Sequence, residues 1–204
     1  MSSTAGPRRI GVLGGTFDPI HLGHLVAASE ALHQLELDQV VFVPAGRPWQ
    51  KSVYSDGEDR FLMTTLGVMG HARFSTSRVE LDRRGPTYTV DTLSTMRDFW
   101  GEETKLFFIT GGDTLAGLST WHEVHKLAGV AELVAVTRPG SDVGSIARED
   151  TWPNIHVLDI PLLAVSGTDV RRRVASGRPI DFLVPPEVVS YIRDHGLYVE
   201  AASA

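Results

Sequence analysis

The sequence contains no cysteine, which excludes disulfide bonds and thiolate metal sites. It has no apolar run that approaches the roughly 20 residues of a membrane-spanning helix. The first eight residues lack the apolar segment of a secretory signal peptide. Positive charge is sparse as well: 19 lysines and arginines against 25 acidic residues give a net charge of −6, which argues against nucleic acid as the main partner. We therefore expect a cytoplasmic protein with neither a nucleic-acid nor a membrane partner.

What remains is the composition of one globular domain. A chain of 204 residues is long enough for a single α/β domain with a real core, and not comfortably long enough for two. Its 42% of apolar and 22% of charged residues are ordinary for a folded protein. We expect the domain to cover residues 9–199, with flexible tails at 1–8 and 200–204. The sequence does not reveal the oligomeric state and allows a homo-oligomer.

Strand-like and helix-like patterns alternate along nearly the whole chain. Several strand-like runs are continuous stretches of Val, Ile, Leu and Phe, as expected for parallel strands that are buried on both faces. The predicted strands cover residues 10–13, 40–44, 74–78, 105–110, 133–137 and 155–160, and the predicted helices 22–35, 58–69, 90–100, 121–127, 170–175 and 187–195. This alternation predicts an α/β fold with a single doubly wound, mostly parallel sheet and helices on both faces.

Loops with glycine or arginine follow the predicted strands at five points. They begin at Gly14, Ala45, Gly111, Arg138 and Val165. In a doubly wound sheet, ligands bind beyond the carboxyl ends of the strands, where all such loops meet. Five of them on one edge predict the rim of an active site.

The most informative segment is residues 14–24 (GGTFDPIHLGH), which we call the motif segment. Its two leading glycines let backbone N–H groups approach a bulky anion, and the helix that follows points its positive end at the same place. His21 and His24 lie three residues apart, on the same face of the first helical turn. Taken alone, the two histidines could be a metal pair or ordinary surface residues. The glycines and the preceding strand favour a phosphate site instead, and beside phosphates the histidine pKa of about 6.5 would rise, favouring the charged donor form.

The motif segment is neither of the commoner glycine loops. It lacks Gly-x-Gly-x-x-Gly and no Gly-Lys-Ser/Thr follows, which argues against a dinucleotide-binding oxidoreductase and against a P-loop enzyme. The segment instead resembles the signature of the HxGH nucleotidylyltransferase superfamily, and its longer form resembles the bacterial nicotinate-nucleotide adenylyltransferases. The resemblance runs from Arg9 to about Tyr198. It implies a Rossmann-like nucleotidylyltransferase fold and the transfer of the adenylyl group of ATP to nicotinate mononucleotide, which gives nicotinate adenine dinucleotide and pyrophosphate in NAD biosynthesis.

Residues 166–171 (SGTDVR) form a second candidate phosphate element. Ser166 or Thr168 can cap a helix N-terminus, and the guanidinium of Arg171 can reach back to an anion held there. The string resembles the family motif (S/T)-x-T-x-x-R, with Gly167 where relatives often have serine. A plain helix cap is the alternative interpretation.

The resemblance also bears on a lysine and on the acceptor. Lys51 matches the family's lysine that meets the ATP phosphates, although Trp49-Gln50 replaces the usual Pro-His pair and a solvated surface lysine is the alternative. Residues 85–93 resemble the segment that packs beside the pyridine nucleotide, and this helix start suits a carboxylate. Residues 111–122 match the Gly-x-Asp…Leu-x-x-Trp pattern, which implies that Trp121 stacks on the pyridine ring. The alternative interpretation of Trp121 is a tryptophan buried in the core. The alternative for Arg138 is an arginine at the rim of the site.

The residues and the resemblance together define three groups. The predicted catalytic residues are His21, His24, Lys51 and Arg171. The predicted ATP-binding residues are Gly14, Gly15, Thr16, Phe17, Gly23, Gly111, Asp113, Arg138, Ser166 and Thr168. The predicted nicotinate mononucleotide-binding residues are Thr87, Tyr88, Thr89, Trp121 and His122. No carboxylate cluster forms an evident metal cage, so Mg²⁺ is expected to be carried with ATP.

Two alternative functions stay open. The acceptor could be nicotinamide mononucleotide, or both mononucleotides, because main-chain N–H groups could make the distinction without a side-chain signature. The chain could also be a catalytically silent nucleotide-binding protein on the same fold. The joint presence of His21, His24, Lys51, Thr168 and Arg171 argues against the silent protein, since simple binding needs no contacts to a leaving group.

Overall fold

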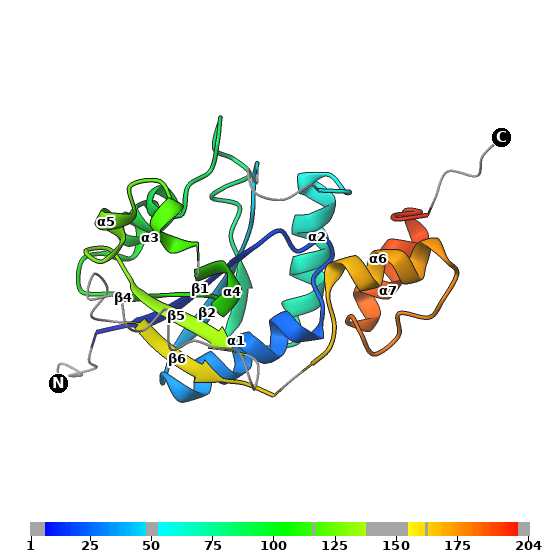
Figure 1. Cartoon of the computed structure of the whole chain (residues 1–204), viewed down its shortest axis with the longest axis horizontal. Coiled ribbons are helices and arrows are strands. Elements are labelled where there is room, and N and C mark those ends of the chain that lie inside the picture. The colour runs from blue at the N-terminus through cyan, green and yellow to red at the C-terminus, as the bar shows by residue number, and fades with distance from the viewer. Residues whose placement is uncertain (1–6, 48–52, 116, 138–154, 162, 200–204) are drawn as a thin grey trace.

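The computed structural model of the chain describes residues 7–47, 53–115, 117–137, 155–161 and 163–199. Within these residues the strands form one parallel six-stranded sheet in the order β3-β2-β1-β4-β5-β6 (Figure 1). The strands are β1 (Arg9–Gly15), β2 (Gln39–Pro44), β3 (Phe74–Thr76), β4 (Lys105–Gly111), β5 (Glu132–Thr137) and β6 (Ile155–Asp159). The predicted parallel sheet is confirmed, and each strand lies close to its predicted position.

The described helices alternate with these strands, as predicted. They are α1 (Leu22–Gln34), α2 (Gly57–Val68), α3 (Thr89–Trp100), α4 (Gly112–Leu115), α5 (Val124–Leu127), α6 (Gly167–Ala175) and α7 (Pro186–Asp194), with a 3-10 turn η1 (Leu118–Thr120). The predicted helix over residues 121–127 is wrong in its extent. Glu123 adopts a left-handed backbone with φ of 46°, which a right-handed helix does not tolerate, so only α5 forms after it. None of the described helices is long and apolar enough to cross a membrane.

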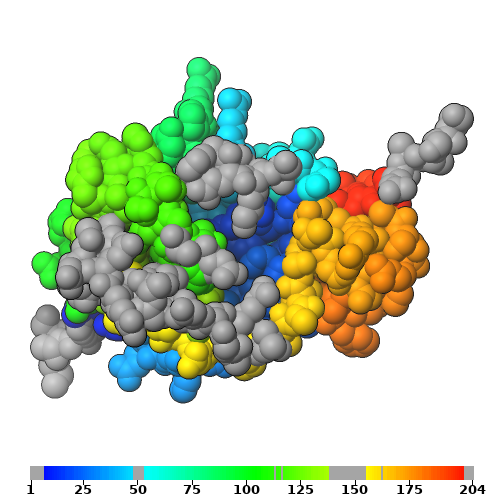
Figure 2. Space-filling model, viewed as in Figure 1, coloured from blue at the N-terminus to red at the C-terminus, as the bar shows by residue number. Residues whose placement is uncertain are grey.

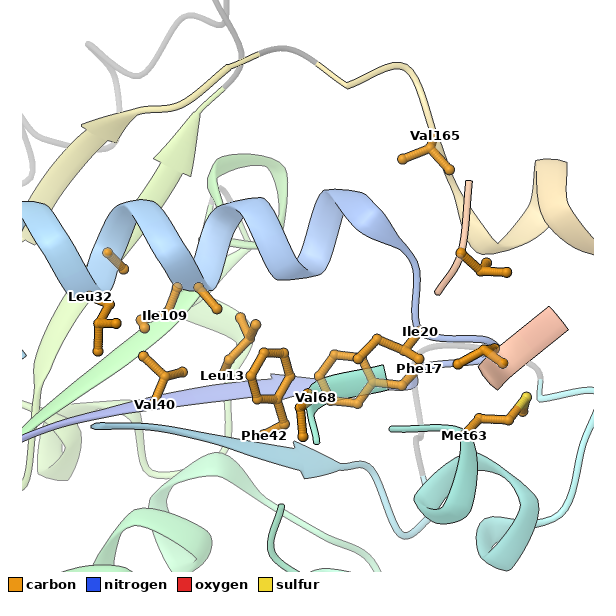
Figure 3. Packing of buried hydrophobic residues seen from close by; sticks show 14 of the residues in the cluster. Leu13, Phe17, Ile20, Leu32, Val40, Phe42, Met63, Val68, Ile109 and Val165 are labelled. Atoms are coloured by element: carbon orange, nitrogen blue, oxygen red, sulfur yellow. The ribbon is translucent and has the colours of Figure 1, made fainter. Parts of the chain in front are cut away.

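Two hydrophobic clusters cover the two faces of the sheet. Alternate residues of β2 show the arrangement, because successive side chains of a strand point to opposite faces. Val40 and Phe42 pack on the α1 and α2 side, while Val41 and Val43 pack on the α3 side. Figure 3 shows Phe42 and Phe17 in the layer between α1 and the strands. The sheet is therefore doubly wound, as predicted.

The helices of the C-terminal region lie beyond one end of the sheet. Figure 1 shows α6 and α7 on the far side of α2, away from β1 and β4. The hydroxyl of Tyr191, on α7, donates a hydrogen bond to the carboxylate of Asp59, on α2, at 2.8 Å. Burial and this bond raise the pKa of the Tyr191 phenol to about 12, so the hydroxyl stays a donor at neutral pH. The backbone N–H of Leu22, at the start of α1, donates to the carbonyl oxygen of Leu183 at 2.9 Å, so the C-terminal region also contacts the place where the motif segment begins α1.

One buried cation joins the loops that follow β1 and β2. The Arg60 side chain, on α2, is 1% exposed, and its Nη1 donates to the carbonyl oxygens of Thr16 at 3.0 Å and of Ala45 at 2.6 Å. Its Nη2 donates to the carbonyl oxygen of Gly46 at 3.4 Å. Burial lowers the pKa of the Arg60 guanidinium, and nearby acidic groups, Asp18 first among them, oppose that shift. Three carbonyl groups at the carboxyl edge of the sheet depend on this one side chain.

We expect the Arg60→Met substitution to destabilise the fold strongly. It keeps most of the apolar volume and removes the three donors, and a buried carbonyl left without its donor costs about 1–3 kcal/mol. Urea unfolding should therefore show a loss of about 3 kcal/mol or more. Arg193→Met, at an exposed position on α7, is the matched control and should leave the unfolding midpoint nearly unchanged. Equal midpoints for the two variants would contradict the role of Arg60.

Candidate active site

The motif segment continues β1 and passes directly into α1. Its two histidine rings stack with their centroids 3.7 Å apart and their planes inclined by 23°, which confirms that they share one face of the first helical turn. The backbone N–H of His21, at the N-cap of α1, donates to Nδ1 of His24 at 3.2 Å. A nitrogen that accepts a hydrogen bond carries no proton, so this bond favours the His24 tautomer with its proton on Nε2.

Phe17 supports His24 from the core. Its side chain is 1% exposed and meets the His24 ring edge-on, with centroids 5.0 Å apart, while Phe42 lies on its other side at 5.8 Å. The phenyl ring belongs to the core and is not among the described residues that line the two cavities of the site, so the predicted contact of Phe17 with ATP would come from its backbone. Its backbone N–H shares a peptide unit with the Thr16 carbonyl that Arg60 holds, and therefore points the opposite way.

Two cavities lie side by side at the carboxyl edge of the sheet. The larger has a volume of about 640 Å³ and the smaller of about 170 Å³. Both are lined by the loop after β1, the end of β4 and Trp121; the shared residues are Gly14, Gly15, Thr16, Thr110, Thr114 and Trp121. In Figure 2 the blue N-terminal residues lie at the bottom of a hollow between the green and yellow parts of the surface. Groups bound in the two cavities would therefore meet above the glycines of the motif segment.

The larger cavity gathers most of the predicted ATP-binding residues. Those that line it are Gly14, Gly15, Thr16, Gly23, Gly111 and Ser166, together with the catalytic candidates His21 and His24. After β6, Ile160, Leu163 and Val165 form an apolar wall of this cavity; the sequence placed Val165 at the rim but did not single out Ile160 or Leu163. The signal available in the sequence for this wall was the run of apolar residues that follows the predicted strand over residues 155–160. Lys51, Arg138 and the side chain of Asp113 lie outside the described residues, so their roles stay predictions.

The smaller cavity gathers all five residues predicted to bind the acceptor. Thr87, Tyr88 and Thr89 come from the start of α3, and Trp121 and His122 close the opposite side. The rings of Tyr88 and His122 stack on each other, with centroids 4.1 Å apart and planes inclined by 26°. Trp121 is half-buried and meets Phe108 edge-on at 5.9 Å, so it both packs on the core and lines the cavity.

A carboxylate that sequence reasoning missed also lines the smaller cavity. Oε1 of Glu80 accepts a hydrogen bond from Oγ1 of Thr92 at 2.9 Å, and its Oε2 accepts one from the backbone N–H of Gly46 at 3.3 Å. A Cβ on Gly46 would come within 2.3 Å of the Glu80 carbonyl oxygen, so glycine is required for this close approach. Nothing in the spacing around Glu80 distinguishes it from a surface acid.

The second candidate phosphate element begins α6, as predicted. Oγ of Ser166 accepts the N–H of Asp169 at 3.1 Å, which confirms Ser166 as the N-cap. Arg171 does not line either cavity. Its Nη1 donates to the carbonyl oxygen of Asp18 at 2.6 Å and its Nη2 to Oγ1 of Thr168 at 3.2 Å. A Cβ on Gly167 would come within 2.9 Å of that same Asp18 oxygen, so the glycine permits α6 to approach the motif segment.

Asp18 is the buried carboxylate of the motif segment and was not among the predicted site residues. It is 4% exposed, and its Oδ2 accepts the backbone N–H of Tyr54 at 2.6 Å. Its Oδ1 accepts the hydroxyls of Ser55 at 2.6 Å and of Tyr198 at 2.7 Å. Burial, and next the bond to Asp18, raise the pKa of the Tyr198 phenol above its usual value. Both oxygens of this carboxylate are therefore engaged by the protein itself.

The fold and the site define a class: a protein with a doubly wound parallel sheet that carries a glycine turn and two stacked histidines at its carboxyl edge. A model of the cytidylyltransferase-like family matches residues 12–173. Two curated relatives, from Clavibacter michiganensis and Leifsonia xyli, are both named "Probable nicotinate-nucleotide adenylyltransferase" and are 50% identical to this chain. The first alignment covers 97% of this chain and 98% of the relative, and the second 95% and 96%. The chain belongs to the cytidylyltransferase-like family and, within it, to the nicotinate-nucleotide adenylyltransferases, which confirms the resemblance in its sequence.

A solved structure supports the fold independently. The nicotinic acid mononucleotide adenylyltransferase of Plasmodium falciparum, complexed with NaAD, superposes with a TM-score of 0.77 at 21% identity. The superposition covers 94% of this chain and 97% of that one. At this identity the likeness shows the shared fold.

We expect His24→Ala to lower kcat for adenylyl transfer by about 10²–10³, because it removes one preorganised donor from the larger cavity. His33→Ala, at an exposed position in the last turn of the same helix, is the matched control and should keep wild-type turnover. Circular dichroism and the urea midpoint should show that both variants fold. Near-wild-type turnover of a folded His24→Ala variant would contradict the role of this histidine.

Proposed function

We propose that the chain transfers the adenylyl group of ATP to nicotinate mononucleotide, giving nicotinate adenine dinucleotide and pyrophosphate, in NAD biosynthesis. The observation that carries this proposal is the junction of the two cavities above Gly14 and Gly15. The larger cavity, with the stacked histidines, suits the triphosphate and adenosine of ATP. The smaller one, with Trp121 and the start of α3, suits a pyridine nucleotide. The two reacting phosphates then meet where both cavities share a wall.

The mechanism needs alignment more than acid–base chemistry. The attacking phosphate oxygen of the mononucleotide is already anionic, so no side chain has to activate it. It attacks the α-phosphorus of ATP in line, the bond to the bridging oxygen of the β-phosphate breaks, and pyrophosphate leaves with that electron pair. Holding both phosphates over one glycine turn removes the entropy of bringing them together. The remaining task is to neutralise charge on the α-phosphate and the leaving group.

We assign that task first to the histidines. The bond from the His21 N–H to Nδ1 of His24 leaves Nε2 of that ring as the nitrogen that can donate to a phosphate oxygen. Lys51, Thr168 and Arg171 complete the proposed contacts to ATP. The Arg171 guanidinium has five N–H groups, so it can keep its bonds to the Asp18 carbonyl and to Thr168 while it donates to a phosphate oxygen.

Mg²⁺ fits as an ion carried by ATP. Among the described residues no three histidine, aspartate or glutamate side chains gather closely enough to hold a metal. The donors along the larger cavity are histidine nitrogens, hydroxyls and glycine-rich backbone, whereas Mg²⁺ prefers oxygen ligands and phosphates. Asp18, the buried carboxylate of the motif segment, already accepts three protein donors. When bound with ATP, the ion would neutralise charge on the phosphates.

One observation favours a second acceptor. Glu80 lines the smaller cavity, and its negative charge would repel the carboxylate of nicotinate more than the neutral amide of nicotinamide. Its two oxygens are already bonded to Thr92 and Gly46, which turns part of that charge away from the cavity. The N–H groups at the start of α3 attract a carboxylate in compensation. Nicotinamide mononucleotide is therefore the alternative acceptor that has to be tested.

The direct test is pyrophosphate release with ATP, Mg²⁺ and either mononucleotide. We expect kcat/KM for the nicotinate form to exceed that for the nicotinamide form by about 10²-fold, because hydrogen bonds to a charged group contribute about 1.5–3 kcal/mol each. Equal use of both would contradict the carboxylate site at α3 and leave the reaction in place. No release with either, while the Clavibacter relative is active in the same assay, would contradict the proposed function itself.

A further inference from the structure

The carboxylate of Asp18 joins parts of the chain that lie far apart in the sequence. The acid belongs to the motif segment, two residues after Thr16 and three before His21. Its donors are the backbone of Tyr54, the hydroxyl of Ser55 and the phenol of Tyr198, close to the C-terminal end of the described residues. The hydroxyls of Ser55 and Tyr198 also lie 3.2 Å from each other. We call Asp18, Ser55 and Tyr198 the carboxylate cluster.

The cluster also reaches the second phosphate element. The carbonyl oxygen of Asp18 accepts Nη1 of Arg171 at 2.6 Å, and the Arg171 guanidinium lies 4.0 Å from the centre of the Tyr54 ring. One residue of the motif segment therefore orients three neighbours: with its carboxylate it holds residues 54–55 and the C-terminal tyrosine, and with its carbonyl it holds α6. A shift of Asp18 moves the backbone that joins Thr16 to His21, and these two residues line the larger cavity.

Such a buried carboxylate is sensitive to the loss of a single donor. A carboxylate is an acceptor only, and once it is removed from water it relies on the donors around it. Tyr198 is the donor that the fold supplies from farthest away, 180 residues along the chain. Without the Tyr198 hydroxyl, Asp18 keeps the two donors of residues 54–55, and the motif segment is free to turn the carboxylate toward water. The Tyr198 hydroxyl then influences the phosphate site without touching a substrate.

We propose that Tyr198 is a positioning residue of the active site, whose hydroxyl holds Asp18 and through it the phosphate-binding geometry of Thr16, His21 and Arg171. The inference rests on the proposed adenylyl transfer and names a residue that this reaction depends on. The competing explanation is that Tyr198 only anchors the C-terminal end of the domain. In that case its hydroxyl contributes stability and does not affect turnover.

The chain offers a matched control for this distinction. The phenol of Tyr191 donates to the carboxylate of Asp59 at 2.8 Å, and like Tyr198 it ties the C-terminal region to an earlier part of the chain. Its partner lies on α2, outside the motif segment and both cavities. Tyr191→Phe and Tyr198→Phe therefore remove the same atom from the same kind of bond, and only the second change reaches Asp18.

The experiment compares these two variants with the wild-type chain by steady-state kinetics with ATP and nicotinate mononucleotide. We expect Tyr198→Phe to lower kcat about 10-fold or more, with a smaller change in KM for either substrate, while Tyr191→Phe stays within about 2-fold of wild type. Asp18→Asn should lower kcat at least as much as Tyr198→Phe. Equal kcat for the two phenylalanine variants, with urea midpoints lowered alike, would overturn the proposal in favour of a plain anchor.

Hydrogen exchange provides a second readout that does not depend on activity. Amide protection across residues 14–24 should fall in Tyr198→Phe and stay at the wild-type level in Tyr191→Phe. If the wild-type chain proved inactive with both mononucleotides, the proposed function would fail, and this exchange pattern alone would decide whether Tyr198 holds the motif segment. Unchanged protection in Tyr198→Phe would overturn the positioning role whatever the activity.

Discussion

The site depends on how the carbonyl groups of the motif segment are held. Arg60 binds the carbonyl oxygen of Thr16 from inside the fold, and Arg171 binds that of Asp18 from α6. Because the C=O and N–H of a trans peptide unit point in opposite directions, holding the Thr16 oxygen directs the next N–H away from Arg60. A turn that binds anions needs its N–H groups accessible and its carbonyls directed elsewhere. Two guanidinium groups meet the second requirement, and the glycines meet the first.

Features encoded by neighbouring residues were predictable from the sequence, whereas residues that act through distant partners were not. The parallel sheet and the shared helical face of His21 and His24 were predicted because local patterns encode them: continuous apolar strands and fixed spacing in one helical turn. The group of residues around Trp121 was predicted from the family resemblance of two contiguous motifs. Arg60 and Tyr198 were not predicted, because each acts through a partner more than 40 residues away. A lone arginine in a helix, or a lone tyrosine near a terminus, carries no signal until tertiary packing sets its neighbours.

The differences from prediction have the same origin. Phe17 belongs to the segment that was predicted to bind ATP, but its ring packs in the core cluster and against His24. Arg171 has the expected place on α6, but the close approach at Gly167 brings the Asp18 carbonyl within its reach. Glu123 interrupts the helical pattern over residues 121–127 with a left-handed backbone, and the residues around it give no sequence signal for that conformation. In each case, packing across the molecule decides what local preference leaves open.

The two cavities place different demands on the one turn that they share. In the proposed reaction, the turn presents donors to the phosphate oxygens of ATP, while Arg60 and Arg171 hold the carbonyl oxygens of Thr16 and Asp18. For the acceptor, the same glycines only have to leave room, and we assign recognition to the start of α3, Trp121 and Glu80, which line the smaller cavity. The proposed function therefore assigns the chemistry of transfer and the choice of acceptor to different residues. A change of acceptor preference should be reachable through Glu80 and α3 without disturbing the arginines and the carboxylate that hold the motif segment.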